Sequence, residues 1–218
     1  MSAASAADPS LVPLSQAFFE REALAVARDL LGVRLITDIE GVRVVSAIVE
    51  TEAYHQSERG CHCYGGKRTK RTTPMFAEGG RSYVYFIYGM HWALNLVTGP
   101  SDVGQAVLIR AVVPLDESVV PLIHQRRRFA QRKRPPSRAF LADPWRWCDG
   151  PGKVCQALAI TGEHNDRPLE SGQPLWVTEG RRIAEADVVV GPRVGIDYAG
   201  EDAQLPWRFQ VRPGAAVR

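Results

Sequence analysis

The chain has 218 residues, of which 45 % are hydrophobic and 23 % are charged, so it can bury a core without metals or disulfides. It has no apolar run of about 18 residues and no charged-then-apolar leader, which argues against a membrane or exported protein. We therefore expect a cytoplasmic protein whose four cysteines are reduced thiols: Cys61, Cys63, Cys148 and Cys155.

The net charge of +3 is distributed unevenly along the chain. Residues 1–58 carry a net charge of −5, residues 59–138 carry +10, and residues 139–218 carry −2. Clustered Lys and Arg gain free energy when they release counterions from phosphates, so the basic middle third suggests a polyanion-binding face. An ordinary solvated charged surface is the alternative.

The first third of the chain predicts a tail, a helix and a hairpin. Residues 1–13 are small and Ala/Ser-rich, which indicates a disordered tail. Apolar residues recur at helical spacing over 15–31, and Gly32 should end that helix. Residues 34–38 and 42–54 alternate as strands around a Glu40-Gly41 turn.

The strand over 42–54 ends with two carboxylates on one face, Glu50 and Glu52, followed by Tyr54. Such a pair can serve as general acid and base, but surface strands often carry similar pairs. The polar loop over 56–73 that follows can track a phosphate backbone. Its basic residues are Arg59, Lys67, Arg68, Lys70 and Arg71.

An aromatic stretch over 83–95 predicts a hairpin. Alternation places Tyr83 and Tyr85 on one face and Val84 and Phe86 on the other. We expect Val84 and Phe86 in the core, and Tyr83 as a packing residue. A turn at Tyr88-Gly89 would leave Tyr88 and Met90 at its tip, because glycine adopts backbone angles closed to other residues. On periodicity alone a core hairpin with aromatic cross-strand pairs is the favoured interpretation, since most such runs are of that kind.

The rest of the chain predicts an apolar strand over 106–113 that contains Arg110. A buried arginine needs a carboxylate partner, and Glu52 is the candidate. No repeat or linker is evident, so we expect one domain. The further elements are helices over 117–129 and 153–160, an exposed basic segment over 126–138, and strands near 175–178, 183–190 and 207–211.

Metal and nucleotide motifs have little support. The Cys61-His62-Cys63 run with Cys148 and Cys155 lacks a Cys-x-x-Cys pair, so zinc is not expected. The Gly150–Lys153 segment lacks P-loop spacing. We therefore expect no metal and no cofactor. Carboxylates, tyrosines, a histidine, an asparagine and an arginine beside a basic surface remain, a set suited to holding an unstacked base and activating water against its sugar bond.

Several segments, in this order, resemble the alkyladenine (3-methyladenine) DNA glycosylase family. The resemblance extends from about Leu14 to Arg212, nearly the whole chain. The segments that carry it are Ile48–Tyr54, His62, Met75-Phe76, Tyr83–Met90, Asn95, Leu108–Ala111, Gly150–Ile160 and Arg193–Ile196.

This resemblance implies an α+β protein with one mixed domain over 14–218, built on a curved antiparallel β-sheet with flanking helices and a protruding β-hairpin. It also implies a monomeric, monofunctional enzyme of base excision repair, nucleoid-associated in a bacterium. The substrate would be double-stranded DNA containing 3-methyladenine, 7-methylguanine, hypoxanthine or ethenoadenine. A non-catalytic protein that binds damaged nucleic acid is the rival hypothesis.

The resemblance also implies a role for each site residue. Tyr88, with Met90, would intercalate into DNA while the damaged base is flipped out. Tyr54 and His62 would stack on one face of that base and Tyr85 on the other. Further roles are Glu52 as general base, Arg110 and the Val194 carbonyl as ligands of the water, Asn95 as discriminator against guanine, and Lys67, Arg68, Lys70 and Arg71 as contacts to the DNA backbone.

Overall fold

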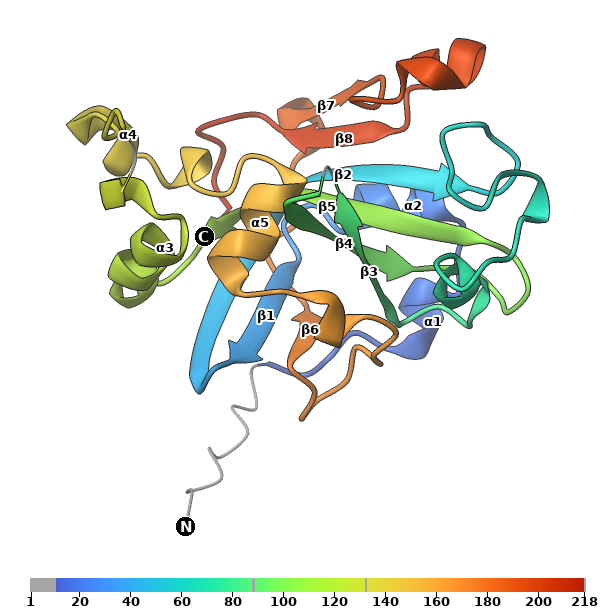
Figure 1. Ribbon diagram of the computed structural model, residues 1–218, viewed down its shortest axis with the longest axis horizontal. Coiled ribbons are helices and arrows are strands. Elements are labelled where there is room, and N and C mark those ends of the chain that lie inside the picture. Colours follow the sequence, from blue (N-terminus) through green and yellow to red (C-terminus); the bar gives the residue numbers. More distant parts are fainter. Residues whose placement is uncertain (1–10, 88, 132, 218) are drawn as a thin grey trace.

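The computed structural model describes residues 11–87, 89–131 and 133–217. In these ranges a curled antiparallel sheet is flanked by short helices (Figure 1), which confirms the predicted α+β class. The strands are β1 (Arg34–Ile39), β2 (Val42–His55), β3 (Ser82–Ile87), β4 (His91–Val97), β5 (Gln105–Pro114), β6 (Leu175–Thr178), β7 (Val188–Gly191) and β8 (Arg208–Val211). The α-helices are α1 (Gln16–Phe19), α2 (Ala23–Asp29), α3 (Val120–Arg126), α4 (Arg138–Leu141) and α5 (Pro151–Leu158). None of these helices is long and apolar enough to cross a bilayer.

The long strand β2 is the centre of the sheet. The strand order is β3-β4-β5-β2-β1-β6, and β8 pairs with both β2 and β7. On one edge β2 pairs first with β1 and then, over Glu50 to Glu52, with β8. Its register against β5 slips at Glu50 and returns at Thr51. The two carboxylates therefore lie where β5, β2 and β8 meet.

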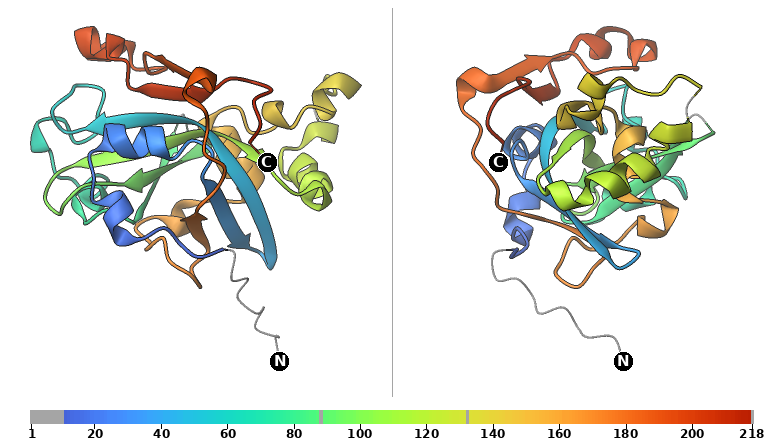
Figure 2. Two further views of the ribbon diagram at one scale, coloured as in Figure 1. Left: turned by 180° about the vertical axis from the view of Figure 1, so that it is seen from behind. Right: turned by 90° about the vertical axis from the view of Figure 1, so that its left-hand side faces the viewer.

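Helices on opposite sides of the sheet close the main core (Figures 1 and 2). Helix α2 packs against β2 and β5 and buries Val26 and Ala27. The Thr51 hydroxyl donates a 2.7 Å hydrogen bond to the Ala27 carbonyl, which joins α2 to β2 beside the carboxylates. Helix α5 packs against β4 and β5 and buries Val154 and Leu158.

The helix predicted over 15–31 is interrupted and forms α1 and α2. The backbone N–H of Ala23, at the start of α2, donates a 2.8 Å hydrogen bond to the Gln105 side chain of β5. A cap supplied from a distant strand is invisible to local periodicity, which explains the wrong prediction of one continuous helix. Helix α2 ends at Asp29, shortly before the predicted stop at Gly32, whose φ of 84° suits glycine.

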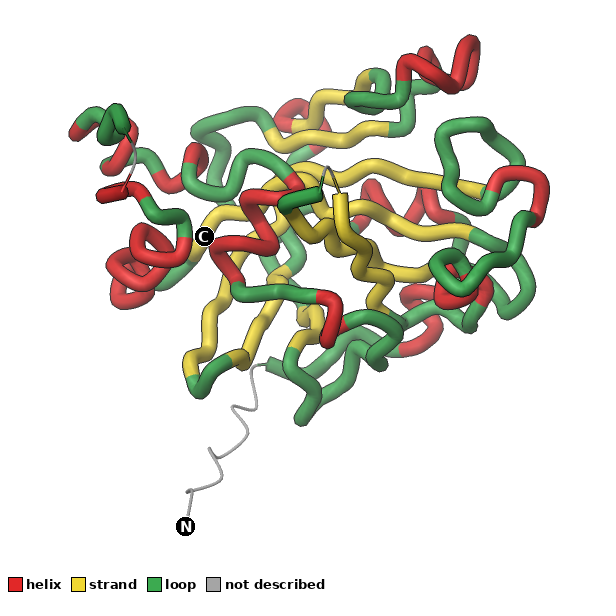
Figure 3. Tube along the Cα trace, in the orientation of Figure 1, coloured by secondary structure: helices red, strands yellow, loops and turns green. Residues whose placement is uncertain are grey.

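Three other predicted segments differ from the structure (Figure 3). Residues 11–13, expected in the tail, lie along β6, where the Trp176 indole donates to the Leu11 carbonyl; residues 1–10 lie outside the described part. The helix predicted over 117–129 is shorter and forms α3. The strand predicted over 183–190 is loop and a 3-10 turn before β7 begins.

Candidate active site

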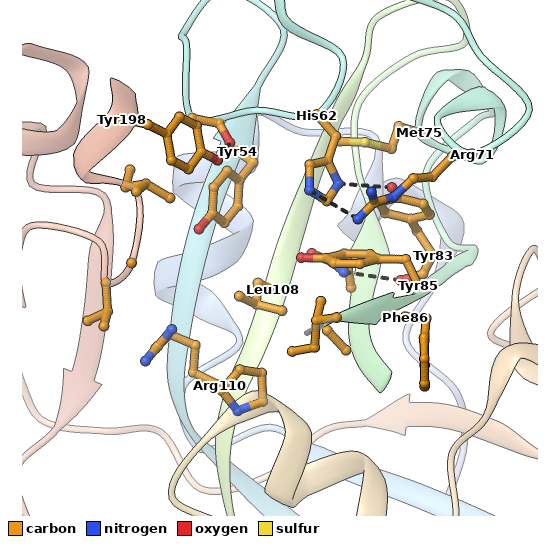
Figure 4. A pocket seen from close by; sticks show the side chains of 18 residues that line it. Tyr54, His62, Arg71, Met75, Tyr83, Tyr85, Phe86, Leu108, Arg110 and Tyr198 are labelled. Carbon is orange, nitrogen blue, oxygen red and sulfur yellow. Dashed lines mark hydrogen bonds between the residues drawn. The ribbon is translucent and has the colours of Figure 1, made fainter. Parts of the chain in front are cut away.

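A pocket of about 350 Å³ opens between the end of β2, the hairpin β3–β4 and the segment 194–198 (Figure 4). This volume is within the usual range for small-molecule sites. Tyr54 lies on one side, and His62 and Tyr85 lie together on the other (Figure 4). We refer to these sides as the Tyr54 wall and the His62–Tyr85 wall.

Glu52 is fully buried, with 0 % of its surface exposed, next to this pocket. The Tyr54 hydroxyl donates a 2.8 Å hydrogen bond to Oε2, and the Val194 backbone N–H donates a 2.7 Å hydrogen bond to Oε1. Arg110 Nη1 lies 3.4 Å from Oε1. All three partners line the pocket. Burial raises the pKa of Glu52, while Arg110 and the two hydrogen bonds oppose this effect. A carboxylate with a raised pKa is a stronger base.

Arg110 contacts both carboxylates of β2. The predicted partner Glu52 is present, but the shorter contact, 2.9 Å from Nε, is to Oε1 of Glu50. Arg208 Nε of β8 donates to the same Glu50 oxygen at 2.6 Å. Glu50 therefore holds two arginines in place, which sequence reasoning did not anticipate, and Arg110 is fixed beside Glu52.

The Tyr54 wall is supported by a buried ion pair that the sequence did not reveal. Arg193 is bonded to both oxygens of Glu58, at 2.6 and 2.7 Å, and also to the Ala53 carbonyl at 3.0 Å. Its guanidinium carbon lies 4.7 Å from the centroid of the Tyr54 ring. The neighbouring residue Val194 contacts Glu52 through its N–H group. The role of the Val194 carbonyl as a ligand of the water stays a prediction.

His62 lies against Tyr85, with ring centroids 4.5 Å apart and planes inclined at 74°. The predicted placement of His62 beside Tyr54 is therefore wrong. The loop from β2 folds back over a second small core, in which Cys61, Cys63 and Tyr83 are buried, and this path carries His62 to the opposite wall. The rings of His62 and Tyr85 are in contact, so a base could only lie between them and Tyr54.

Arg71 also lines the pocket, although the sequence suggested only a contact to the DNA backbone. Its guanidinium carbon lies 4.8 Å from the centroid of the Tyr85 ring, and Nη2 lies 3.4 Å from Nε2 of His62. Because arginine only donates, Nε2 must be the acceptor, and Nδ1 then donates to the Tyr83 hydroxyl at 3.0 Å. Burial, together with Arg71, lowers the pKa of His62 to about 4. His62 is therefore neutral at physiological pH.

Asn95, the predicted discriminator against guanine, is a polar residue of strand β4. It is buried and lines the pocket, and its Nδ2 donates a 3.1 Å hydrogen bond to the Tyr83 carbonyl. This bond fixes the orientation of the amide. The adjacent Tyr83 ring is also buried, as predicted for a packing residue.

The hairpin β3–β4 ends in an exposed tip. Tyr88, the predicted intercalating residue, lies outside the described residues, while Met90 is 67 % exposed. Val84 is buried as expected for the core face, but the same expectation for Phe86 is wrong. Phe86 is 48 % exposed and packs against Trp92, with ring centroids 4.8 Å apart. The second face of the hairpin therefore extends beyond the core.

The basic loop presents its side chains in different environments. Lys67 and Lys70 are exposed. Arg68 forms an ion pair with Asp102, and its guanidinium carbon lies 4.2 Å from the centroid of the Phe76 ring. Exposed lysines in the loop that carries Arg71 suit contact with a phosphate backbone, whereas Asp102 partly compensates the charge of Arg68.

The cysteines are four free, buried thiols. The Sγ atoms of Cys61 and Cys63 lie 3.2 Å apart on either side of His62 in sequence. Within the described ranges, no three or more His, Cys, Asp or Glu side chains gather in a way that could hold a metal ion.

A buried carboxylate next to a pocket of aromatic rings, beside a basic loop, defines a hydrolase that acts on nucleic-acid bases. The family described as methylpurine-DNA glycosylase matches residues 17–214. The chain belongs to this family and is a DNA glycosylase, an enzyme of DNA repair. This finding decides against the rival hypothesis of a non-catalytic binding protein.

Relatives from several bacteria support the assignment, and each of the three described here carries the name "Putative 3-methyladenine DNA glycosylase". The Clostridium botulinum protein is 39 % identical over 201 residues, 91 % of this chain and 95 % of the relative. The Carboxydothermus hydrogenoformans protein is 41 % identical over 91 % of this chain and 95 % of the relative. The Desulfitobacterium hafniense protein is 41 % identical over 94 % and 97 %.

Proposed function

We propose that this DNA glycosylase flips damaged purines out of duplex DNA and hydrolyses their N-glycosidic bond with water activated by Glu52, leaving an abasic site. The observation that carries the proposal is the placement of Glu52, which is fully buried and held by three residues that line the pocket. The proposed lesions are 3-methyladenine, 7-methylguanine, hypoxanthine and ethenoadenine, and the enzyme acts as a monomer.

The extruded base stacks between the Tyr54 wall and the His62–Tyr85 wall. Each base–aromatic stack contributes about 1–3 kcal/mol. Asn95, whose amide is oriented by the Tyr83 carbonyl, meets the purine edge and rejects the 2-amino group of guanine.

The reaction uses the carboxylate as a base. The water oxygen forms a bond to C1′ while the C1′–N9 bond breaks, the bonding electrons pass to the purine, and the water proton passes to Glu52. Arg110 and the Val194 N–H hold the carboxylate in the orientation that this transfer requires. Positioned base catalysis contributes typically about 10²- to 10⁴-fold. None of the described residues that line the pocket is a lysine, which supports hydrolysis without a Schiff base.

The hairpin tip and the basic loop bind the DNA around the lesion. Met90 is exposed, and Met90 and Tyr88 enter the minor groove to fill the gap left by the flipped nucleotide. Lys67, Arg68 and Lys70 follow the phosphates. Affinity for DNA therefore falls as salt concentration rises.

The experiment is an excision assay on duplex oligonucleotides that contain one hypoxanthine, ethenoadenine or methylated purine, followed by cleavage of abasic sites. Glu52→Gln retains binding and loses about 10²- to 10⁴-fold in rate. The exposed Glu78→Gln is the matched control and keeps the wild-type rate. Absence of excision of every lesion by the wild type, or full activity of Glu52→Gln, would refute the proposal.

A further inference from the structure

The charged side chains that line the pocket leave one of its walls positively charged. The two residues with permanent charge in its described lining are Arg71 and Arg110, and this lining contains no carboxylate. Arg110 is compensated by Glu50 and Glu52, at 2.9 and 3.4 Å. In the described part of the chain, the contacts of Arg71 are instead uncharged: the His62 imidazole, the Tyr85 ring and the Tyr83 hydroxyl. The pocket therefore carries one uncompensated positive charge on the His62–Tyr85 wall.

The neighbours of Arg71 leave that charge in place. Nε2 of His62 accepts from Arg71, so this imidazole is neutral and supplies no counter-charge. The Tyr85 ring already has the guanidinium against it, at 4.8 Å from the ring centroid. A positively charged base on this wall would share the π-electrons with Arg71 and would also be repelled by it.

We infer that Arg71 is a specificity-determining residue, which favours uncharged purine lesions such as hypoxanthine over purines that carry a positive charge from N-alkylation, such as 7-methylguanine. The inference rests on the proposed function, since it requires that the lesion enters this pocket.

The change in charge on the base during the reaction explains why Arg71 favours uncharged lesions. When the C1′–N9 bond breaks, its electron pair moves onto the purine, so an uncharged base gains negative charge in the transition state and is attracted by Arg71. An N-alkylated cationic base starts with one positive charge and is still partly positive in the transition state, so Arg71 repels it. The two transition states differ by about one unit of charge on the base, and kcat/KM reports that difference.

The test measures kcat/KM for two duplexes that are identical except for one hypoxanthine or one 7-methylguanine. Arg71→Gln lowers the ratio of hypoxanthine to 7-methylguanine excision about tenfold, the size appropriate to a charge interaction partly exposed to solvent. Arg71→Lys keeps the charge and stays near the wild-type ratio. The matched control is Arg68→Gln, which removes an arginine from the same loop outside the pocket lining and leaves the ratio unchanged.

Two results would overturn the inference while leaving the proposed function intact. An equal loss of kcat/KM on both duplexes would make Arg71 a phosphate contact, and an unchanged ratio would make it a structural residue. Failure of the wild type to excise either base would instead refute the proposed function, and the inference with it.

Discussion

The two walls of the pocket use the same pair of groups in different ways. Each places an arginine against a tyrosine ring, with guanidinium carbon to centroid distances of 4.7 Å for Arg193 on Tyr54 and 4.8 Å for Arg71 on Tyr85. Arg193 is buried and ion-paired with Glu58, whereas Arg71 is exposed and contacts neutral rings. Arg193 therefore stabilises the fold, whereas Arg71 leaves an uncompensated positive charge at the pocket.

The largest expected effect tests whether the Tyr54 wall is scaffold. Glu58→Gln should lower the free energy of unfolding by about 3–5 kcal/mol, because it leaves the buried Arg193 without its counter-charge. Denaturant titration measures this change. A loss below about 1 kcal/mol, the size expected of an exposed ion pair, would remove the distinction between the walls.

The His62–Tyr85 wall should make the stability of the folded protein depend on pH. The pKa of His62 is about 4 in the folded protein against 6.5 for the free side chain, so the unfolded chain takes up a proton first as pH falls. The folded state therefore loses stability from pH 6.5 down to 4, by about 3 kcal/mol at most.

His62→Gln removes this contribution, and other titrating groups cancel in the comparison with the wild type. Denaturant titrations of both proteins at pH 7 and pH 4.5 supply the measurement. Equal declines in stability for the two proteins would mean that His62 titrates normally.

A smaller effect is expected on the pH–rate profile, because only the Tyr54 wall is hydrogen-bonded to Glu52. Tyr54→Phe removes the hydroxyl that donates to Glu52, a bond to a charged group worth about 1.5–3 kcal/mol. That bond lowers the pKa of Glu52, so its loss raises the pKa further. The acidic limb of the pH–rate profile should move to higher pH. Tyr85→Phe, the control on the opposite wall, should leave this limb in place.

The smallest effect belongs to the loop outside the pocket. Asp102→Asn breaks the exposed ion pair with Arg68 and should change the free energy of unfolding by less than about 1 kcal/mol. Thermal unfolding measures the change. A loss of free energy of unfolding as large as that of Glu58→Gln would show that the exposed Arg68–Asp102 pair stabilises the protein as much as the buried Arg193–Glu58 pair.

Predictions from sequence succeeded where local pattern decides the structure. The alternation around Glu40-Gly41 located β1 and β2 to within a residue at each end, and the strand expected at 175–178 is β6. The division of α1 from α2 was missed because the Gln105 side chain that caps α2 comes from β5. Periodicity contains no information on such a long-range contact.

The candidate site shows the same boundary between local and long-range information. Glu50 and Glu52 are two residues apart on one strand, so alternation placed both on one face, although only Glu52 was predicted as a partner of Arg110. The wall occupied by His62 and the entry of Arg71 into the pocket depend on the path of an irregular loop. Glu58 and Arg193 are far apart in sequence, and no motif announced their ion pair.

The burial of the four cysteines has a consequence for an enzyme that works amid alkylation damage. Electrophiles that methylate purines also attack thiolates, and the reactivity of a thiol depends on its access and its ionisation. Cys61 and Cys63 are 5 % and 0 % exposed behind the His62–Tyr85 wall, so burial protects both sulfur atoms even though the hydrogen bond from Cys61 lowers the pKa of Cys63. The agents that create the substrate therefore have little access to the nucleophilic sulfur atoms next to the pocket.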